Sequence, residues 1–369
     1  MRKQGSLINT SHVAVPPTQG IKYAGSKLQL LPYIFRILAQ VPDAKTFFDG
    51  FAGTTRVSQA AAQLGFATTC NDSAVWSKVF ATCYLLSEQP DAYYQEILDH
   101  LNSLRGRHGW FTEHYGGKPL EGKKPFQIHN TLKLDAIREE IDRLHLNDID
   151  TAVILTSLIL ALDRVDNSLG HFASYLAQWA PRSYNSLDLA MPQRFPLRKR
   201  HRVLQLDIFE AIQQMDGHDI AYLDPPYGSN NEKMPPSRVR YASYYHLWKT
   251  VILNDKPALF GKAQRREDSR DTVTASIFEE FRKAPDGSFY ALKALARLLK
   301  EVKAHYVLLS YSSGGRATWE SLLDILHTQG KLHHAVQVDY KKNVMATMRW
   351  THAWASDQKN LEYLFLWEK

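Results

Sequence analysis

The sequence predicts an α/β fold that carries a mainly helical insertion. Residues 45–70 have the order strand, helix, strand, because two short apolar runs flank a glycine-containing turn and an alanine-rich helical pattern. This rhythm stops between about residues 91 and 200, where apolar residues have helical spacing. It returns with apolar runs at residues 203–206 and 220–223. We therefore expect one large α/β domain, divided in the sequence by the insertion.

The composition is that of a globular protein with a polyanionic partner. Of the 369 residues, 44% are hydrophobic and 22% are charged, the formal net charge is +7 and the pI is about 9.1. A basic surface attracts phosphate groups, so nucleic acid is the first candidate partner.

Cysteine usage and hydropathy predict the cellular setting. Cys70 and Cys83 are the only cysteines, and no group of Cys and His residues has the spacing of metal ligands. The first 19 residues lack the apolar core of a signal peptide, and the most apolar stretch, residues 152–162, is too short to span a bilayer. We expect a cytoplasmic, nucleoid-associated protein that uses neither a metal ion nor a membrane.

The first strand–helix–strand unit has features of a nucleoside-binding site. We predict a strand, a turn, a helix and a second strand at residues 45–49, 50–55, 56–64 and 66–70. Asp72 follows the second strand about twenty residues after the turn, where such units have an acid that binds ribose hydroxyls. Two simpler interpretations stay open: Thr54 caps an ordinary turn, and Asp72 caps a helix that begins near Ala74.

The insertion combines buried helices with a basic, aromatic loop. The spacing in residues 135–144 and the apolar run at residues 149–162 predict two helices, of which the second is buried. Around residues 105–126, basic side chains alternate with aromatic ones in a glycine-rich stretch, which suits phosphate contact and base stacking. The candidate nucleic-acid contacts there are Arg105, Arg107, Lys123 and Lys124. A solvated loop with aromatic anchors is the alternative.

A second basic run lies between the insertion and the next predicted strand. It contains Arg198, Lys199 and Arg200, and it predicts a contact to a phosphate backbone at a domain boundary. A soluble linker is the alternative interpretation.

The second half of the chain returns to strands and helices. Strands are predicted at residues 203–206, 220–223 and 305–309, with a closing pair at 335–340 and 361–366. Helices are predicted at residues 208–213, 289–299 and 319–327. Residues 227–286 fit no compact element, and the charged stretch 262–271 is predicted to be mobile.

The tetrapeptide Asp224-Pro225-Pro226-Tyr227 directly follows the apolar run 220–223. Open α/β folds bind ligands where the chain leaves the carboxyl ends of the strands. The prolines have no N–H and a nearly fixed φ, so the turn presents carbonyl oxygens and one carboxylate to N–H donors. The amino group of adenine is such a donor, and the Tyr227 ring offers a stacking surface. The simpler alternative is that the two prolines only end the strand.

Several motifs in this order resemble those of the Dam-like, alpha-class DNA adenine N6-methyltransferases. Residues 22–27, KYAGSK, are similar to the KWAGGK motif of that family, and residues 49–55, DGFAGTT, are similar to its acid followed by FxGxG. Asp72, Asp207 and the DPPY turn follow in the family's order. Residues 163–172, DRVDNSLGHF, also resemble a segment of some members, without an assigned role.

The resemblance implies a Rossmann-like methyltransferase sheet, mostly parallel with an antiparallel closing strand, and an inserted, mainly helical target-recognition domain. The catalytic domain would comprise residues 1–90 and 201–369, and the recognition insertion residues 91–200. Asp72 is expected on the ribose of S-adenosylmethionine and Asp207 near its adenine amine. The residues expected to bind S-adenosylmethionine are Tyr23, Ala24, Gly25, Lys27, Asp49, Phe51, Gly53, Asp72, Asp207 and Asp224.

Two positions depart from the family pattern. Thr55 replaces the second glycine of FxGxG, which adds a Cβ close to the donor, although a threonine at a helix start can cap N–H groups. Tyr23 stands where the family often has Trp, so a stacking face is kept. We expect donor binding to survive both changes.

The activity that the resemblance implies is methyl transfer to N6 of a flipped adenine in duplex DNA, within or derived from a restriction–modification system. The expected catalytic residues are Asp224, Pro225, Pro226 and Tyr227. We expect a monomer without a metal ion, and a cognate restriction endonuclease is a candidate second partner. Three alternatives stay open: an RNA adenine N6-methyltransferase, a catalytically silent nucleic-acid-binding protein, and a methyltransferase for the cytosine amino group, for which the family usually has Ser in place of Asp224.

Overall fold

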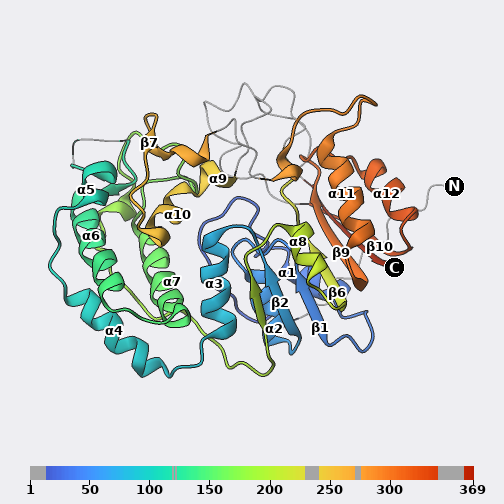
Figure 1. The fold of residues 1–369 in the computed structure, drawn as a ribbon, viewed down its shortest axis with the longest axis horizontal. Coiled ribbons are helices and arrows are strands. Elements are labelled where there is room, and N and C mark those ends of the chain that lie inside the picture. The colour runs from blue at the N-terminus through green and yellow to red at the C-terminus, as the bar shows by residue number, and fades with distance from the viewer. Residues whose placement is uncertain (1–13, 119, 121–122, 229–240, 271–275, 340–360) are drawn as a thin grey trace.

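A seven-stranded sheet forms the centre of the computed structural model, which describes residues 14–118, 120, 123–228, 241–270, 276–339 and 361–369 (Figure 1). The strand order is β10-β11-β9-β6-β1-β2-β5. The strands are β1 (Thr46–Asp49), β2 (Ala67–Asn71), β5 (Arg202–Leu204), β6 (His218–Leu223), β9 (Ala304–Ser312), β10 (Lys331–Asp339) and β11 (Leu361–Glu368). Strand β11 is antiparallel to both neighbours, and the other pairs are parallel. The predicted mostly parallel sheet with an antiparallel closing strand is confirmed.

Helices cover both faces of this sheet. Successive apolar side chains of a strand point to opposite faces, so each face has an apolar surface that a helix can bury. Phe47 of β1 lies in a core with α1 (Leu31–Leu38) and α2 (Arg56–Gln63). The next residue, Phe48, points to the opposite face. That face is covered by α8 (Ile208–Gln213), α11 (Tyr290–Glu301) and α12 (Trp319–His327).

The insertion helices form a second core beside the sheet, with α3 between the two (Figure 1). This core is made by α3 (Val75–Leu86), α4 (Asp91–Ser103), α5 (Trp110–Tyr115), α6 (Ile128–Arg143) and α7 (Asp148–Val165). Helix α7 is buried along almost its whole length, as its apolar sequence predicts. A short parallel pair, β3 (Gly116–Gly117) and β4 (Phe126–Gln127), and the 3₁₀ turn η1 (Pro181–Tyr184) complete the layer.

The prediction that residues 227–286 contain no compact element is wrong for the described residues of this segment. They form α9 (Tyr241–Tyr244), α10 (His246–Leu253), β7 (Leu259–Phe260), β8 (Arg265–Arg266), η2 (Glu267–Ser269) and η3 (Ile277–Glu279). Helix α10 packs into the insertion core, where Arg138 donates hydrogen bonds to the carbonyls of Val251 and Ile252. The partner residues lie more than 110 positions away in the sequence, so local periodicity gave no sign of this packing.

Of the charged stretch 262–271, predicted to be mobile, residue 271 lies outside the described residues, and the others form a hairpin arm and a 3₁₀ turn. The Arg266 side chain is buried, and its guanidinium makes ion pairs with Asp255 at 2.6 Å and with Asp268 at 3.0 Å. Bidentate pairing of this kind fixes a charged strand that has no apolar pattern.

Candidate active site

A cavity of about 400 Å³ opens at the carboxyl ends of β1, β2 and β6. These strands are parallel neighbours, so the residues that follow them meet at one edge of the sheet. The turn at residues 224–227, predicted to be catalytic, and nearly all the predicted donor-binding residues line this cavity: Tyr23, Gly25, Lys27, Asp49, Phe51, Gly53, Asp72, Asp207, Asp224, Pro225, Pro226 and Tyr227. Ala24 is outside the lining, and its backbone N–H donates a hydrogen bond to the Tyr245 hydroxyl at 2.6 Å.

Lys27, Asp224 and Tyr227 form a closed set of contacts in the cavity wall. The Lys27 Nζ lies 2.8 Å from Asp224 Oδ2 and donates to the Tyr227 hydroxyl at 2.7 Å. That hydroxyl donates to Asp224 Oδ1 at 3.0 Å. Burial raises the pKa of the Asp224 carboxyl, while Lys27 and the tyrosine hydroxyl lower it. The acid that follows β6 is thus held by a cation contributed from the beginning of the chain.

Asp49, the last residue of β1, has an unusual environment. It is fully buried, and burial raises its pKa from 3.8 to about 7, although the Ser58 hydroxyl donates to Oδ2 at 2.6 Å and opposes the rise. The Oδ1 atom has no hydrogen-bond partner among the described residues. A carboxylate with a free oxygen at the cavity wall is suited to bind a cationic or N–H-bearing ligand.

The raised pKa of Asp49 predicts a pH-dependent stability difference between the wild type and Asp49→Asn. Asp49 keeps its proton up to about pH 7 in the folded protein but releases it near pH 4 in the unfolded chain. Its contribution to the free energy of unfolding is therefore complete below pH 4 and is lost as the pH rises to about 7. The neutral amide does not titrate. We expect the free energy of unfolding of the variant to rise, relative to that of the wild type, by about 1.4 kcal/mol per pH unit across this window.

Urea unfolding of both proteins at pH 5, 6, 7 and 8 measures this difference. Asp324→Asn changes an exposed acid on α12 and serves as the matched control, for which we expect a constant offset from the wild type. A constant offset for Asp49→Asn as well would show that the carboxyl ionises normally in the folded protein.

The glycine turn after β1 is organised by Asp72. Its Oδ2 accepts the Gly53 N–H at 2.8 Å, and its Oδ1 accepts the Ala74 N–H at 2.8 Å just before α3. The N-cap residue of α3 is Ala74, without a side-chain capping bond, so Asp72 fixes the turn before the helix and does not cap it. The residue also lines the cavity. Gly53 has φ of +51°, and a Cβ there would lie 3.3 Å from the Tyr23 ring, so a side chain at this position would be strained.

Neither threonine of the turn caps α2, which corrects both capping predictions. The N-cap residue is Thr55, without a side-chain capping bond, and its hydroxyl instead accepts a hydrogen bond from Gln59 Nε2 at 3.0 Å. Thr55 has φ of +61°, so it adopts the left-handed conformation that the family's glycine would take without a Cβ. A side-chain cap is found at another helix, α8, where Asp207 accepts the Phe209 N–H.

Two tyrosines that the sequence interpretation left without a role support the donor motif. The Tyr23 ring stacks on Tyr245 with centroids 4.4 Å apart, and on Tyr241 at 5.6 Å with a 30° tilt. Tyr241 lines the cavity. The signal in the sequence was the aromatic cluster at residues 241–248, but nothing local connects it to Tyr23.

Glu362 is a further buried acid near the catalytic turn that the sequence interpretation missed. It is the second residue of β11 and is 6% exposed, and burial raises its pKa while Lys27 lowers it and Asp224 raises it. An acid inside an otherwise apolar strand was the available sign, because a buried charge is costly unless another charge compensates it.

The predicted nucleic-acid contacts lie in several places. Arg105, Arg107 and Lys123 are exposed in the insertion, and Arg107 lies 3.7 Å from Glu139. The Lys124 ammonium donates to the His114 carbonyl. The run Arg198, Lys199 and Arg200 is exposed but precedes the amino end of β5, at the edge of the sheet opposite to the cavity. The structure therefore does not bring this run together with the catalytic turn.

The described residues contain neither a cluster of metal ligands nor a helix suited to a membrane. No group of three or more His, Cys, Asp or Glu side chains in the described part of the chain could hold a metal ion. Among the helices that the structure describes, none has both the length and the apolar character needed to cross a bilayer.

Comparison with known proteins agrees with the geometry of the cavity. The chain is 28% identical over 324 residues to the modification methylase StsI of Streptococcus sanguinis, covering 83% of this chain and 46% of that protein. It is 27% identical over 331 residues to the type II methyltransferase M.NlaIII of Neisseria lactamica, covering 87% and 92% respectively. For the type II methyltransferase M.FokI of Planomicrobium okeanokoites the identity is 25% over 341 residues, covering 87% and 49%. The chain spans about half of two of these relatives and most of the third.

The family model of the D12 class N6 adenine-specific DNA methyltransferases matches residues 23–293. This span begins at Tyr23 in the donor motif and includes the insertion and the Asp224 turn. The resemblance to Dam-like adenine methyltransferases is confirmed, and the protein belongs to the D12 class N6 adenine-specific DNA methyltransferase family.

Proposed function

We propose that this protein transfers a methyl group from S-adenosylmethionine to the N6 amino group of an adenine flipped out of duplex DNA. The observation that carries the proposal is the contact of Lys27, Asp224 and Tyr227 in one cavity. The family gives the reaction class. The contact supplies what the reaction needs, an ionised acceptor fixed at the end of a strand.

The cavity wall suits a cationic methyl donor. At the strand ends the carboxyl groups of Asp49, Asp72 and Asp224 outnumber the ammonium of Lys27. A sulfonium and an amino group would favour the ionised form of these acids, and Asp49 Oδ1 offers an unused acceptor among the described residues. We propose Asp72 for the ribose hydroxyls and Asp207 for the adenine amine. The full donor set is Tyr23, Ala24, Gly25, Lys27, Asp49, Phe51, Gly53, Asp72, Asp207 and Asp224.

The residues of the turn act on the adenine amino group, whose lone pair is delocalised into the ring. The Asp224 carboxylate and the Pro225 carbonyl each accept one N–H, which localises the lone pair on nitrogen and directs it for in-line attack. When bound, S-adenosylmethionine supplies an electrophilic methyl group on a sulfonium. The N–C bond forms as the S–C bond breaks, the sulfur leaves as a neutral thioether, and the methylated amine releases one proton.

Lys27 and Tyr227 lie beside the Asp224 carboxyl and have separate proposed roles. The ammonium of Lys27 favours the carboxylate form of Asp224, which accepts hydrogen bonds, over the acid form, which donates one. The Tyr227 ring lines the cavity beside the acid, and we propose that the flipped adenine stacks on it. Pro226 lacks an N–H and keeps the turn rigid.

We further propose that residues 91–200 recognise the target and that residues 1–90 and 201–369 form the catalytic domain. The protein would act as a cytoplasmic monomer on nucleoid DNA, within or derived from a restriction–modification system. A cognate restriction endonuclease is the proposed second partner, supported by relatives that are named as type II methyltransferases. Light scattering of the purified chain, with and without duplex DNA, tests the monomer.

The proposed DNA contacts are Arg105, Arg107, Lys123, Lys124, Arg198, Lys199 and Arg200. If most of them neutralise phosphates, raising the salt from about 50 to 200 mM weakens duplex binding by about a thousandfold. Lys123→Ala removes an exposed cation and is expected to lower the slope of log affinity against log salt by about one. Lys300→Ala, on the exposed surface of α11 and remote from the insertion, is the matched control with an unchanged slope (Figure 1). Equal slopes for all three proteins would remove Lys123 from the interface.

A methyl-transfer assay with a labelled donor tests the reaction itself. Duplex DNA and RNA of the same sequence are compared, and the methylated bases are then sequenced. We expect N6-methyladenine in the duplex at one short target sequence. Label in RNA alone would favour the RNA methyltransferase, label on cytosine the amino-cytosine enzyme, and duplex binding without label the silent binding protein.

A further inference from the structure

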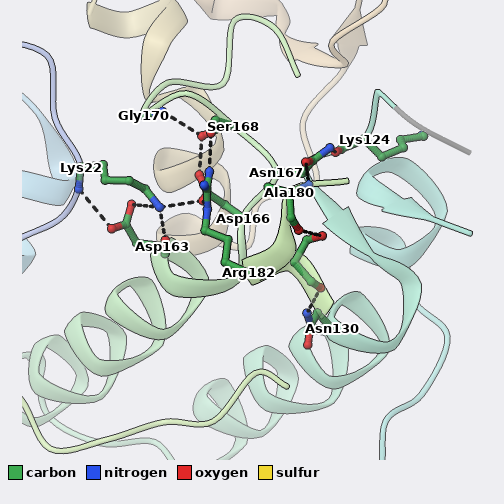
Figure 2. Close-up of polar contacts among 11 residues, drawn as sticks. Lys22, Lys124, Asn130, Asp163, Asp166, Asn167, Ser168, Gly170, Ala180 and Arg182 are labelled. Atoms are coloured by element: carbon green, nitrogen blue, oxygen red, sulfur yellow. Dashed lines mark hydrogen bonds and ion pairs between the residues drawn. The ribbon is translucent and has the colours of Figure 1, made fainter. Parts of the chain in front are cut away.

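A partly buried cluster of charges, with Asp166 fully buried at its centre, joins the donor motif to the insertion. We call Lys22, Asp163, Asp166, Ser168 and Arg182 the Lys22 cluster (Figure 2). The Lys22 Nζ donates to Asp166 Oδ1 at 2.7 Å and to the Asp163 carbonyl, and it lies 3.6 Å from Asp163 Oδ1. The Arg182 Nε donates to the same Asp166 oxygen at 2.8 Å. Two carboxylates therefore face two cations.

The cluster is anchored to the main chain on the donor side. The Lys22 backbone N–H donates to Asp163 Oδ2 at 3.1 Å, so both the backbone and the side chain of Lys22 contact the end of α7. The next residue is Tyr23, which lines the cavity, and Lys27, a few residues further along the same motif, lines it too. Any displacement of Lys22 is therefore transmitted to residues that contact the donor site.

On the other side, the cluster continues into the loop that follows α7. The Ser168 hydroxyl donates to Asp166 and accepts the Gly170 N–H at 3.1 Å. Asn167, fully buried beside Asp166, donates from its side chain to the carbonyls of Lys124 and Leu176. Its side-chain oxygen accepts the Ala180 N–H at 2.9 Å, as Figure 2 shows.

The loop in turn contacts the basic segment proposed to bind DNA. The Lys123 N–H donates to the Leu176 carbonyl at 3.1 Å, and the Asn167 N–H donates to the Pro125 carbonyl at 2.7 Å. A continuous set of bonds therefore runs from Lys22 through Asp166 and Asn167 to residues 123–125. Such a contiguous network is a physical route by which two sites influence each other.

Burial makes this network sensitive to the loss of a single charge. Asp166 is fully buried, and removing one cation would leave its carboxylate with Arg182 alone among the charges described here. A buried carboxylate that loses its partner is strongly destabilised, so the surrounding loop would rearrange. Burial and the charge of Asp166 also raise the pKa of Asp163 to about 7, while Lys22 opposes that rise.

We propose that Lys22 is a positioning residue for methyl transfer, which ties the donor site to the target-recognition region through Asp163 and Asp166. This inference rests on the proposed function. Lys22 itself would contact neither the donor nor the base. Its ammonium fixes the distance between residues 22–27 and the loop at residues 166–182, so that duplex binding and donor binding support each other.

Lys22→Met, Lys22→Arg and Asp163→Asn test this role. Methyl transfer to unmethylated plasmid DNA gives kcat and KM, and calorimetry gives the separate affinities for S-adenosylhomocysteine and for the plasmid DNA. For Lys22→Met we expect kcat/KM to fall by about a hundredfold, as for small misplacements far from the reacting atoms. Each separate affinity should stay within about threefold, and wild-type donor affinity should rise about fivefold or more when DNA is present, a rise that the variant loses.

Conservative changes separate positioning from folding. Lys22→Arg keeps the cation and is expected to restore kcat/KM to within about threefold of the wild type. Asp163→Asn keeps an acceptor for the Lys22 N–H and should lose activity to an intermediate degree. Lys133→Met removes a half-buried lysine whose ammonium donates to the Asn102 and Leu104 carbonyls inside the insertion, and serves as the matched control with unchanged kinetics.

The outcomes distinguish the two levels of the proposal. Unchanged kcat/KM in a folded Lys22→Met, or equal losses in Lys22→Met and Lys22→Arg, would overturn the positioning role alone. Loss of S-adenosylhomocysteine affinity in the absence of DNA would assign Lys22 to the donor site and overturn it too. A wild-type protein that methylates no adenine would overturn the proposed function, and the positioning role with it.

Discussion

Asp224→Ala is expected to reduce methyl transfer by at least about a thousandfold while duplex binding stays nearly unchanged. The acid lies in the wall of the cavity and not on the exposed insertion, so its loss affects the adenine amino group rather than the phosphate contacts. Without the carboxylate, only the Pro225 carbonyl remains to accept an N–H, and the amine lone pair stays delocalised in the ring. The Lys27 ammonium, which loses its counter-charge, would further disfavour a cationic donor nearby.

Three proteins beside the wild type make this test specific. Asp224→Asn keeps the shape and one acceptor oxygen but removes the charge, so we expect activity between those of Asp224→Ala and the wild type. Asp216→Ala, in an exposed position just before β6, should have wild-type turnover. Thermal unfolding and gel-shift titration with duplex DNA check folding and binding. Turnover retained in folded Asp224→Ala would exclude the acid from the mechanism.

The site residues that directly follow a strand could be predicted from the sequence. A carboxylate and two prolines directly after the apolar strand β6 are recognisable because both the strand and the turn have local signatures. The same holds for Asp72, which follows β2 at the spacing that parallel sheets require. These residues line the cavity because adjacent parallel strands bring their carboxyl ends together.

The rest of the site depends on contacts between distant segments that no local pattern encodes. Lys27 bonds the Asp224 turn across a separation of 200 positions, counted to Tyr227, and these contacts exist only once α1 packs on the sheet. Glu362 enters the same neighbourhood from β11, through strand pairing at the far end of the chain. Tyr245 reaches Tyr23 because α10 packs into the insertion core.

Propensity rules failed where tertiary packing decided the conformation. Thr55 was expected at most to cap a helix, yet it holds a left-handed φ that a β-branched residue seldom adopts, in a fully buried position. Its hydroxyl is engaged by Gln59, and it stands one residue beyond the cavity wall at Thr54. The substitution of glycine is thus accommodated by the packing around it and not by capping.

Lys27→Met is expected to lower methyl transfer by about a hundredfold at pH 7, through its effect on Asp224. Burial already raises the pKa of Asp224, and the Lys27 ammonium at 2.8 Å is the largest influence that lowers it. Without the cation the pKa rises further, so the carboxyl becomes protonated and donates a hydrogen bond where the amino group of adenine needs an acceptor.

The sign of the pH effect separates this mechanism from a direct role of Lys27 at the donor. Because the active form is the carboxylate, the acidic limb of the profile of kcat/KM against pH moves to higher pH in Lys27→Met, and activity recovers as the pH rises. Lys27→Arg retains a cation and should shift the limb much less. When Asp224→Ala is already present, adding Lys27→Met should reduce methyl transfer little further, since the two residues act together. A uniform loss of activity without a shifted limb would limit Lys27 to donor binding and remove its effect on Asp224, because an ammonium that contacts only the donor cannot change the ionisation of that acid.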